Sequence, residues 1–92
     1  MIVGTLRVRF LLREARSLKD KRQVVKSVKD RLRNSFNVSV AEIEAQDNRQ
    51  LAVLGLAMVS NEAHHVKTAL SQVVQALRVH PVAELLEFEL DV

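Results

Sequence analysis

The sequence contains no cysteine, no tryptophan and no tyrosine, and it has only two glycines and one proline in 92 residues. Without cysteine, disulfide bonds, thiolate zinc sites and cysteine nucleophiles are all excluded. Two glycines are too few for the glycine-rich loops that hold nucleotide phosphates. Phenylalanine is the only aromatic residue type among Phe, Trp and Tyr, and it occurs three times, so the composition argues against base stacking on aromatic side chains as a mode of nucleic-acid recognition. The interpretation therefore depends on the pattern of apolar and charged residues.

A long apolar run is also missing. A transmembrane helix needs about 20 consecutive apolar residues, and the apolar N-terminal stretch is already interrupted at Arg7, which argues against a signal peptide as well. Hydrophobic residues make up 48% of the chain and charged residues 27%, as in soluble globular proteins. We expect one cytoplasmic domain spanning residues 1–92, with no role at a membrane.

Apolar periodicity predicts six elements. A first strand alternates from Leu6 to Leu12. A helix over residues 17–34 begins at Ser17 as N-cap, with Asp20 in its first turn. The remaining elements are a strand over 36–44 with a bulge near 40–42, a strand over 51–59, a helix that Ser60 or Asn61 caps and that ends before or at Pro81, and an alternating strand over 86–92.

The order βαββαβ predicts the α+β class and a ferredoxin-like architecture. Right-handed crossovers then give a four-stranded antiparallel sheet in the order 4-1-3-2, with two helices on one face. In this order the first and last strands are neighbours. Arg7 and Arg9 would therefore face Glu87, Glu89 and Asp91 on the uncovered face of the sheet.

Two short segments suggest a family. Ser17-Leu18-Lys19-Asp20-Lys21-Arg22 leads into the first helix, and Asn37-Val38-Ser39-Val40-Ala41-Glu42 lies in the second strand. Together they resemble the YlxP-like family of small bacterial proteins of unknown function, over essentially the whole chain. The resemblance implies a ferredoxin-like fold and a cytoplasmic bacterial protein. Genes of that family often lie near genes for translation initiation and ribosome maturation factors, so the resemblance also implies a ribosome-associated, RNA-binding role.

Charge is unevenly distributed along the chain. Residues 1–36 carry eleven Lys/Arg and three Asp/Glu, a net charge of +8, whereas residues 37–92 carry three and eight, a net charge of −5. On the first helix, basic residues spaced three and four apart fall within an arc of about 80° beside the apolar stripe. Such a stripe can follow a phosphate backbone. The predicted binding residues for RNA, or for another anionic partner, are Arg16, Lys19, Lys21, Arg22, Lys26, Lys29 and Arg33. The alternative is a solvated surface whose aliphatic stems cover the core.

The uncovered face of the sheet supports a second interpretation. Small apolar residues of the third strand would lie there together, and an exposed apolar patch usually marks an interface. The predicted homodimer interface consists of Val53, Gly55, Ala57 and Val59. On this alternative the protein is a homodimeric protein–protein interaction module without a nucleic-acid role. The stems of Arg7 and Arg9 would instead shield the patch if the protein is a monomer.

Catalysis and metal binding find little support in the sequence. His64 and His65 are adjacent and point about 100° apart on a helix, while His80 lies at the far end of the same helix. We therefore expect no metal and no cofactor. Arg13 or Arg16 follows the first strand, as in acyl phosphate hydrolases of this fold, but the glycine-rich loop of that family is absent. We expect a binding protein with no catalytic residues rather than an enzyme.

Overall fold

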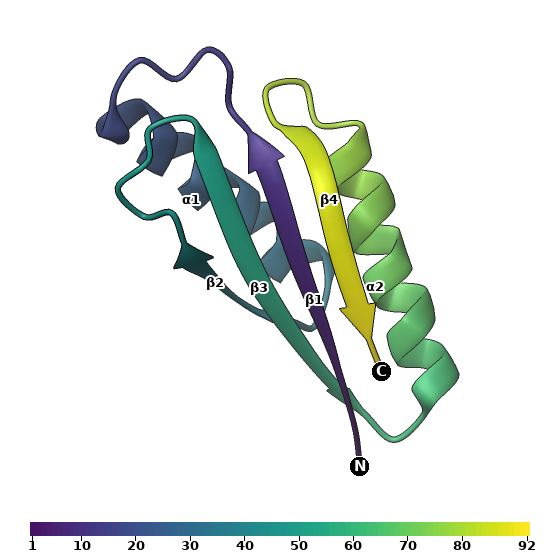
Figure 1. Cartoon of the computed structure of the whole chain (residues 1–92). Coiled ribbons are helices and arrows are strands. Elements are labelled where there is room, and N and C mark those ends of the chain that lie inside the picture. Colours follow the sequence, from purple (N-terminus) through teal and green to yellow (C-terminus); the bar gives the residue numbers. More distant parts are fainter.

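A four-stranded antiparallel sheet carries both helices on one of its faces (Figure 1). The computed structural model describes all 92 residues, and the α+β class and the βαββαβ order are as predicted. The elements are β1 (Ile2–Leu11), α1 (Leu18–Ser35), β2 (Ser39–Glu44), β3 (Leu51–Ser60), α2 (Ala63–Arg78) and β4 (Glu84–Asp91). Both chain ends lie at the same end of the sheet (Figure 1).

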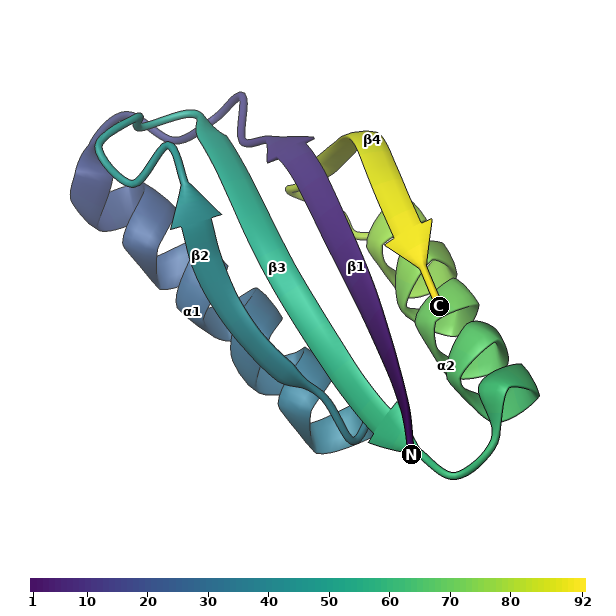
Figure 2. The ribbon, with the colours of Figure 1, turned by 60° about the horizontal axis from the view of Figure 1, so that its bottom comes forward.

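The strands lie in the order β2-β3-β1-β4, which is 4-1-3-2 when counted from the β4 edge. The two long strands β1 and β3 form the centre and pair from Ile2 opposite Ser60 to Leu11 opposite Leu51. Figure 2 shows α1 beneath the β2 side of the sheet and α2 beneath the β4 side. The two edges of the sheet are therefore each accompanied by a different helix.

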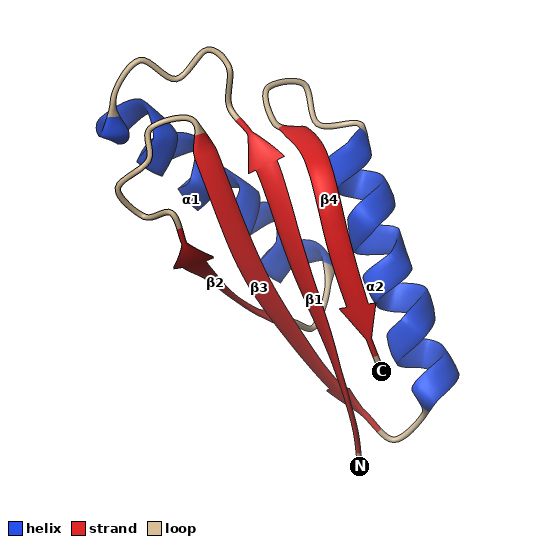
Figure 3. Cartoon of the chain, viewed as in Figure 1, coloured by secondary structure: helices blue, strands red, loops and turns tan.

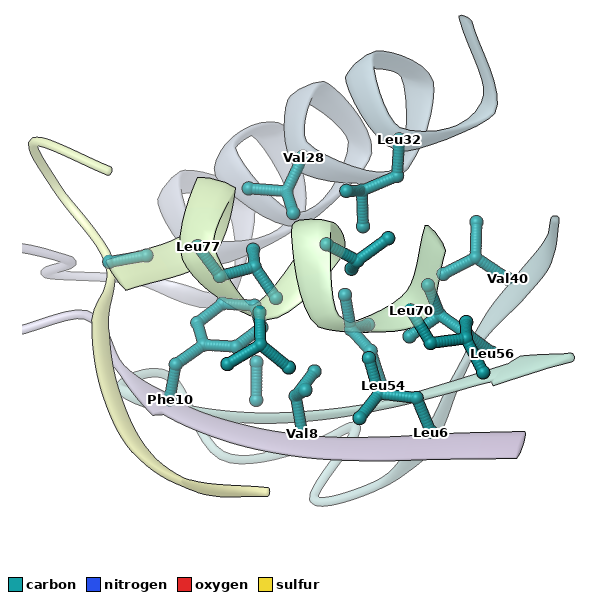
Figure 4. Close-up of a cluster of buried hydrophobic side chains, with 14 of the residues drawn as sticks. Leu6, Val8, Phe10, Val28, Leu32, Val40, Leu54, Leu56, Leu70 and Leu77 are labelled. Carbon is teal, nitrogen blue, oxygen red and sulfur yellow. The ribbon is translucent and has the colours of Figure 1, made fainter. Parts of the chain in front are cut away.

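The core lies between the sheet and the two helices (Figure 4). Alternate residues of β1 point into it because side chains of a strand alternate between its two faces. Leu6, Val8 and Phe10 are each almost fully buried. They meet residues spaced three and four apart on the helices, namely Val25, Val28 and Leu32 of α1 and Val66, Leu70, Val73 and Leu77 of α2.

The two helix starts differ. Ser17 caps α1 as predicted: its Oγ accepts a hydrogen bond from the Asp20 N–H, and the Asp20 carboxylate accepts one from the Arg16 N–H. The prediction for α2 was wrong, because its N-cap is Glu62, which makes no side-chain capping bond. The Ser60 hydroxyl instead accepts a hydrogen bond from the Glu62 N–H and holds the turn before the helix. Pro81 lies beyond the end of α2, as predicted.

Strand β2 is shorter than predicted and its irregularity lies slightly later. Phe36 and Val38 precede the strand and pack against the core from outside it. The register with β3 shifts between Glu42 and Glu44, so Ile43 is the extra residue of a bulge. A side chain on Gly55 would meet that of Ile43 at 3.0 Å. The absence of a side chain at Gly55 therefore makes room for Ile43 on the uncovered face.

Candidate functional site

The basic stripe of α1 lies on the flank of the helix that is turned toward β2. We call Lys19, Arg22, Lys26, Lys29 and Arg33 the basic flank. Arg33 donates a hydrogen bond of 2.9 Å to the main-chain carbonyl of Val40 in β2. Arg31, on the opposite side of α1, instead lines a hollow with Leu77 and His80 at the α2 end. The basic flank therefore lies on the side of α1 away from Arg31, and α1 itself accompanies the β2 side of the sheet (Figure 2).

Most of the basic flank is free of ion pairs. Lys19 and Arg22 are exposed and Lys29 is half-buried, and none of them has an acidic partner within 4 Å. Asp30 is the one carboxylate among them, 2.9 Å from Lys26 Nζ and 3.6 Å from Arg33 Nη1. The hydrogen bond from Lys26, helped by the surrounding positive charges, lowers the pKa of Asp30. Asp30 thus pairs with two of the five cations and leaves the other three without a carboxylate partner.

Lys21 does not belong to this surface, contrary to the sequence prediction. Its side chain is fully buried beneath β2, because the position continues the apolar stripe of Val25, Val28 and Leu32. The ammonium group donates a hydrogen bond to the carbonyl of Ala45 and lies 2.7 Å from the Glu42 carboxylate. A buried ammonium with these partners is unavailable to a phosphate, so Lys21 has a structural role.

The cations outside the basic flank are neutralised differently. On the uncovered sheet face, Arg7 lies 2.9 Å from Glu44 and Arg9 lies 3.2 Å from Glu87. The hydrogen bond from Arg7 to Glu44 raises the pKa of the guanidinium, despite the opposing effect of desolvation. Strand pairing therefore places these two arginines of the basic half of the chain beside carboxylates of the acidic half, and the charges neutralise each other. The predicted facing of β1 arginines and β4 acids is confirmed for Glu89, opposite Arg7, and for Glu87, opposite Arg9, whereas Asp91 lies opposite Thr5.

A hollow lies at the loop end of the sheet, beside the residues that precede α1. The β1–α1 loop and the β2–β3 turn lie side by side there (Figure 3), joined by a 2.7 Å hydrogen bond from the Leu12 N–H to the Gln50 carbonyl. The hollow has a volume of about 590 Å³. Three arginines line it, namely Arg13, Arg16 and Arg49, together with Glu14, Ala15 and Gln50. Of the three, Arg13 is paired, with Glu84 at 2.8 Å.

Arg49 is the residue that sequence reasoning missed at this surface. It stands 33 positions after Arg16 in the chain, in a segment with net negative charge. The predicted topology contained the necessary signal, because β1 ends and β3 begins at the same end of an antiparallel sheet. The turn before β3 must therefore lie beside the loop that follows β1.

The uncovered sheet face carries the predicted dimer residues, but not in one exposed patch. Val53 is 2% exposed, lying between Arg9 on one side and Glu44 on the other. Its prediction as a contact residue was wrong, because its neighbours already cover it within one chain. Gly55 and Ala57 line a hollow of about 530 Å³, and Val59 is exposed beyond it.

The three histidines do not form a metal site with other potential ligands. His64 and His65 are exposed on α2, and no group of three potential metal ligands occurs in the structure. His80 is half-buried, and its Nδ1 accepts a hydrogen bond of 3.3 Å from the Val82 N–H. Burial, with a smaller effect of Arg31, lowers the pKa of His80. Neither α1 nor α2 combines the length and the apolar composition of a membrane-spanning helix.

Comparison with known proteins places the chain in a family. Residues 3–90 match the family described as "Protein of unknown function (DUF503)". The chain belongs to the DUF503 family. It is also 34% identical over 83 residues to a protein of Bacillus subtilis (strain 168) described as "Uncharacterized protein YlxP", and the match covers 90% of each chain. The predicted YlxP-like resemblance is thereby confirmed.

In this DUF503 protein the two segments that carried the resemblance meet in space. Ser17–Arg22 forms the cap and first turn of α1, and Asn37–Glu42 leads into and forms most of β2. The contact between them is the pair formed by Lys21 and Glu42. The two segments therefore hold α1 against β2. They orient the basic flank without themselves forming most of it.

Proposed function

We propose that this DUF503 protein is a non-enzymatic RNA-binding protein that acts on the ribosome or its RNA in the bacterial cytoplasm. The contact surface consists of the basic flank of α1 and, at the loop end, Arg16 and Arg49. The observation that carries the proposal is a group of five unpaired cations along α1 and the loop end, more than the other surfaces carry. Arg7, Arg9 and Arg13 each have a carboxylate partner, whereas Arg16, Lys19, Arg22, Lys29 and Arg49 have none within 4 Å.

The spacing of the basic flank suits a phosphate backbone. Arg33 lies fourteen positions after Lys19, which corresponds to roughly 21 Å along a helix. Five cations over that length stand about 5 Å apart on average. Arg16 and Arg49 extend the row beyond the helix start, where main-chain N–H groups also favour anions. Release of counterions from the RNA would supply most of the binding free energy.

Recognition by base stacking does not fit the side chains. The uncovered sheet face, where RNA-recognition motifs of similar topology carry aromatic residues, here presents Arg7, Arg9, Gly55 and Ala57. Phe10 is buried in the core. We therefore infer recognition of the RNA backbone and its shape, with little reading of sequence.

A matched pair of charge reversals tests the proposal. The test variant is Lys19→Glu/Arg22→Glu on the basic flank. The control is Arg31→Glu/Lys67→Glu, which reverses two exposed, unpaired helical cations on other surfaces. Both change the net charge from +3 to −1. Binding is measured by fluorescence anisotropy with a ribosomal RNA hairpin at several salt concentrations, and by co-sedimentation with ribosomal subunits.

We expect the test variant to bind at least about 10-fold more weakly, with a salt dependence reduced by one to two phosphate contacts. The control should lose much less affinity. Equal losses in both variants would reduce the effect to overall charge and overturn the assignment of the surface. Absence of salt-sensitive binding in the unmodified protein would overturn the RNA proposal itself.

One observation favours a second candidate function, a homodimeric interaction module. Val3 and Val59 lie opposite each other at the end of the β1–β3 pair, and both are exposed. A second copy could cover them together with Ala57. Sedimentation equilibrium at low and high salt tests this candidate. A dimer that persists at high salt and dissociates in Val59→Glu would support it, whereas a monomer at tens of micromolar would dismiss it.

A further inference from the structure

Strand β4 forms the edge of the sheet opposite the basic flank (Figure 1). It pairs with β1 on one side only, so half of its main-chain N–H and C=O groups point away from the sheet. An edge of this kind can accept a further strand. Edges are commonly blocked by proline, lysine or a bulge. The eight residues of β4 include no proline or lysine, and their one bulge lies at Leu86, before the regular stretch from Glu87 to Asp91.

The two faces of β4 have contrasting chemistry. Glu87, Glu89 and Asp91 lie on the uncovered sheet face. Phe88 and Leu90 lie on the helix side, opposite Val8 and Leu6, yet they are 40% and 36% exposed. Arg78 of α2 lies over the Phe88 ring, with its guanidinium carbon 5.7 Å from the ring centroid, and leaves the ring partly exposed. The edge thus offers a row of acids on one face and an incompletely covered apolar row on the other.

The protein itself contains a strand that matches this edge. β1 alternates Arg7 and Arg9 with Leu6 and Val8, and it lies on the inner side of β4. Arginines face glutamates on one side of the sheet, and apolar residues face apolar residues on the other. Residues directly opposite in antiparallel strands share a face. A strand added at the outer side would therefore meet the same alternation.

The arginines of β1 do not neutralise all the acids of β4. Asp91 has no cation within 4 Å, and Glu89 lies 3.9 Å from Arg7, whose nearer partner is Glu44 at 2.9 Å. A second copy of this chain does not fit the edge, because antiparallel pairing of two β4 strands would place acids opposite acids. The charge pattern selects a strand that carries cations.

We propose that the free edge of β4 binds an extended segment of another protein in which Lys or Arg alternates with apolar residues. Main-chain hydrogen bonds to the edge would supply affinity. The cations would face Glu89 and Asp91, and the apolar side chains would cover Phe88 and Leu90. This surface lies on the edge opposite α1, so the inference is independent of RNA binding.

The probe is a capped ten-residue peptide in which Arg alternates with Val, carrying a fluorophore. A scrambled peptide of the same composition, with its arginines grouped at one end, controls for simple charge attraction. Anisotropy titrations measure affinity, and amide chemical-shift mapping of the ¹⁵N-labelled protein locates the site. We expect the alternating peptide to bind at least about 10-fold more tightly than the scrambled one, with shifts concentrated in residues 84–91.

A charge exchange tests the side-chain pairing. Glu89→Lys/Asp91→Lys should weaken the Arg–Val peptide at least about 10-fold and create binding of a Glu–Val peptide. Asp47→Lys/Glu62→Lys reverses two exposed acids elsewhere and should leave the peptide preference unchanged. Equal binding of the scrambled peptide, shifts located outside β4, or occupation of the edge by a second copy in sedimentation experiments would each overturn the proposal.

Discussion

Lys21 and Glu42 join the first turn of α1 to the end of β2, with 2.7 Å between the ammonium nitrogen and a carboxylate oxygen. The lysine side chain is fully buried and the glutamate is 16% exposed. The same ammonium donates a hydrogen bond to the carbonyl of Ala45, whose φ of 60° lies in the left-handed region. The pair therefore holds the bulged end of β2, and the turn that follows it, against the first turn of α1.

Breaking this pair on one side should destabilise the protein strongly. Lys21→Met retains a long aliphatic chain but leaves the Glu42 carboxylate without a cation. We expect the free energy of unfolding to fall by about 3 kcal/mol, the range for a buried pair that loses one partner. Urea denaturation measures the change.

Replacing both partners should restore most of that loss. In Lys21→Met/Glu42→Leu no buried charge remains, so we expect stability within about 1–2 kcal/mol of the unmodified protein. Additive losses in the double variant would contradict this account of the pair. If the protein binds RNA as proposed above, Lys21→Met should leave the salt dependence of that binding unchanged in the folded protein, because the buried Lys21 contacts no phosphate.

A side chain at Gly4 should disrupt the contact between β1 and α2. A Cβ built there would lie 2.2 Å from a methyl carbon of Val66 and 3.1 Å from one of Leu70. We expect Gly4→Ala to lower the free energy of unfolding by about 1–3 kcal/mol, the usual range for overpacking. Gly4→Ala/Val66→Ala removes the colliding methyl group, so it should lose less than the sum of the two single variants.

The α1 cap can be tested with an internal control. Ser17→Ala removes the hydroxyl that accepts from the Asp20 N–H, and we expect a loss of about 1 kcal/mol in unfolding free energy. Ser27→Ala makes the same change at an exposed position within α1. It should be neutral or slightly stabilising, because alanine favours helix. Equal effects at both positions would show that the cap contributes nothing.

His80 predicts an acid-side loss of stability. Because burial lowers its pKa in the folded protein, the unfolded chain takes up a proton first, below about pH 6.5. The stability contributed by neutral His80 is therefore present above this pH and is lost as the pH falls through the folded-state pKa. His80→Asn keeps an acceptor for the Val82 N–H and cannot titrate. Between pH 7 and pH 5, thermal melts should show a larger fall in Tm for the unmodified protein than for His80→Asn.

Local patterns predicted most of the fold because they report directly on burial. Alternation in β1, the Ser17 cap and the order of elements all follow from short-range periodicity and hydrogen-bonding chemistry. Elements whose ends depend on distant partners were less well predicted. β2 was placed three residues too early because Phe36 and Val38 are apolar but pack against the core ahead of the strand. Asn61 and Ser60 have the chemistry of an N-cap, yet the chain turns into α2 only after Glu62.

The sequence by itself determined the fold class, the neighbouring positions of the β1 arginines and the β4 acids, and the row of cations along α1. These follow from the periods of helices and strands, which are local properties of the chain. Tertiary structure alone decided which charges stay free. Lys21 became a buried ion-pair partner because Glu42 and Ala45 lie beneath the same helix turn, and Arg49 joined Arg16 because two loops meet at one end of the sheet. Whether a charge is paired depends on neighbours distant in sequence, which no local period records.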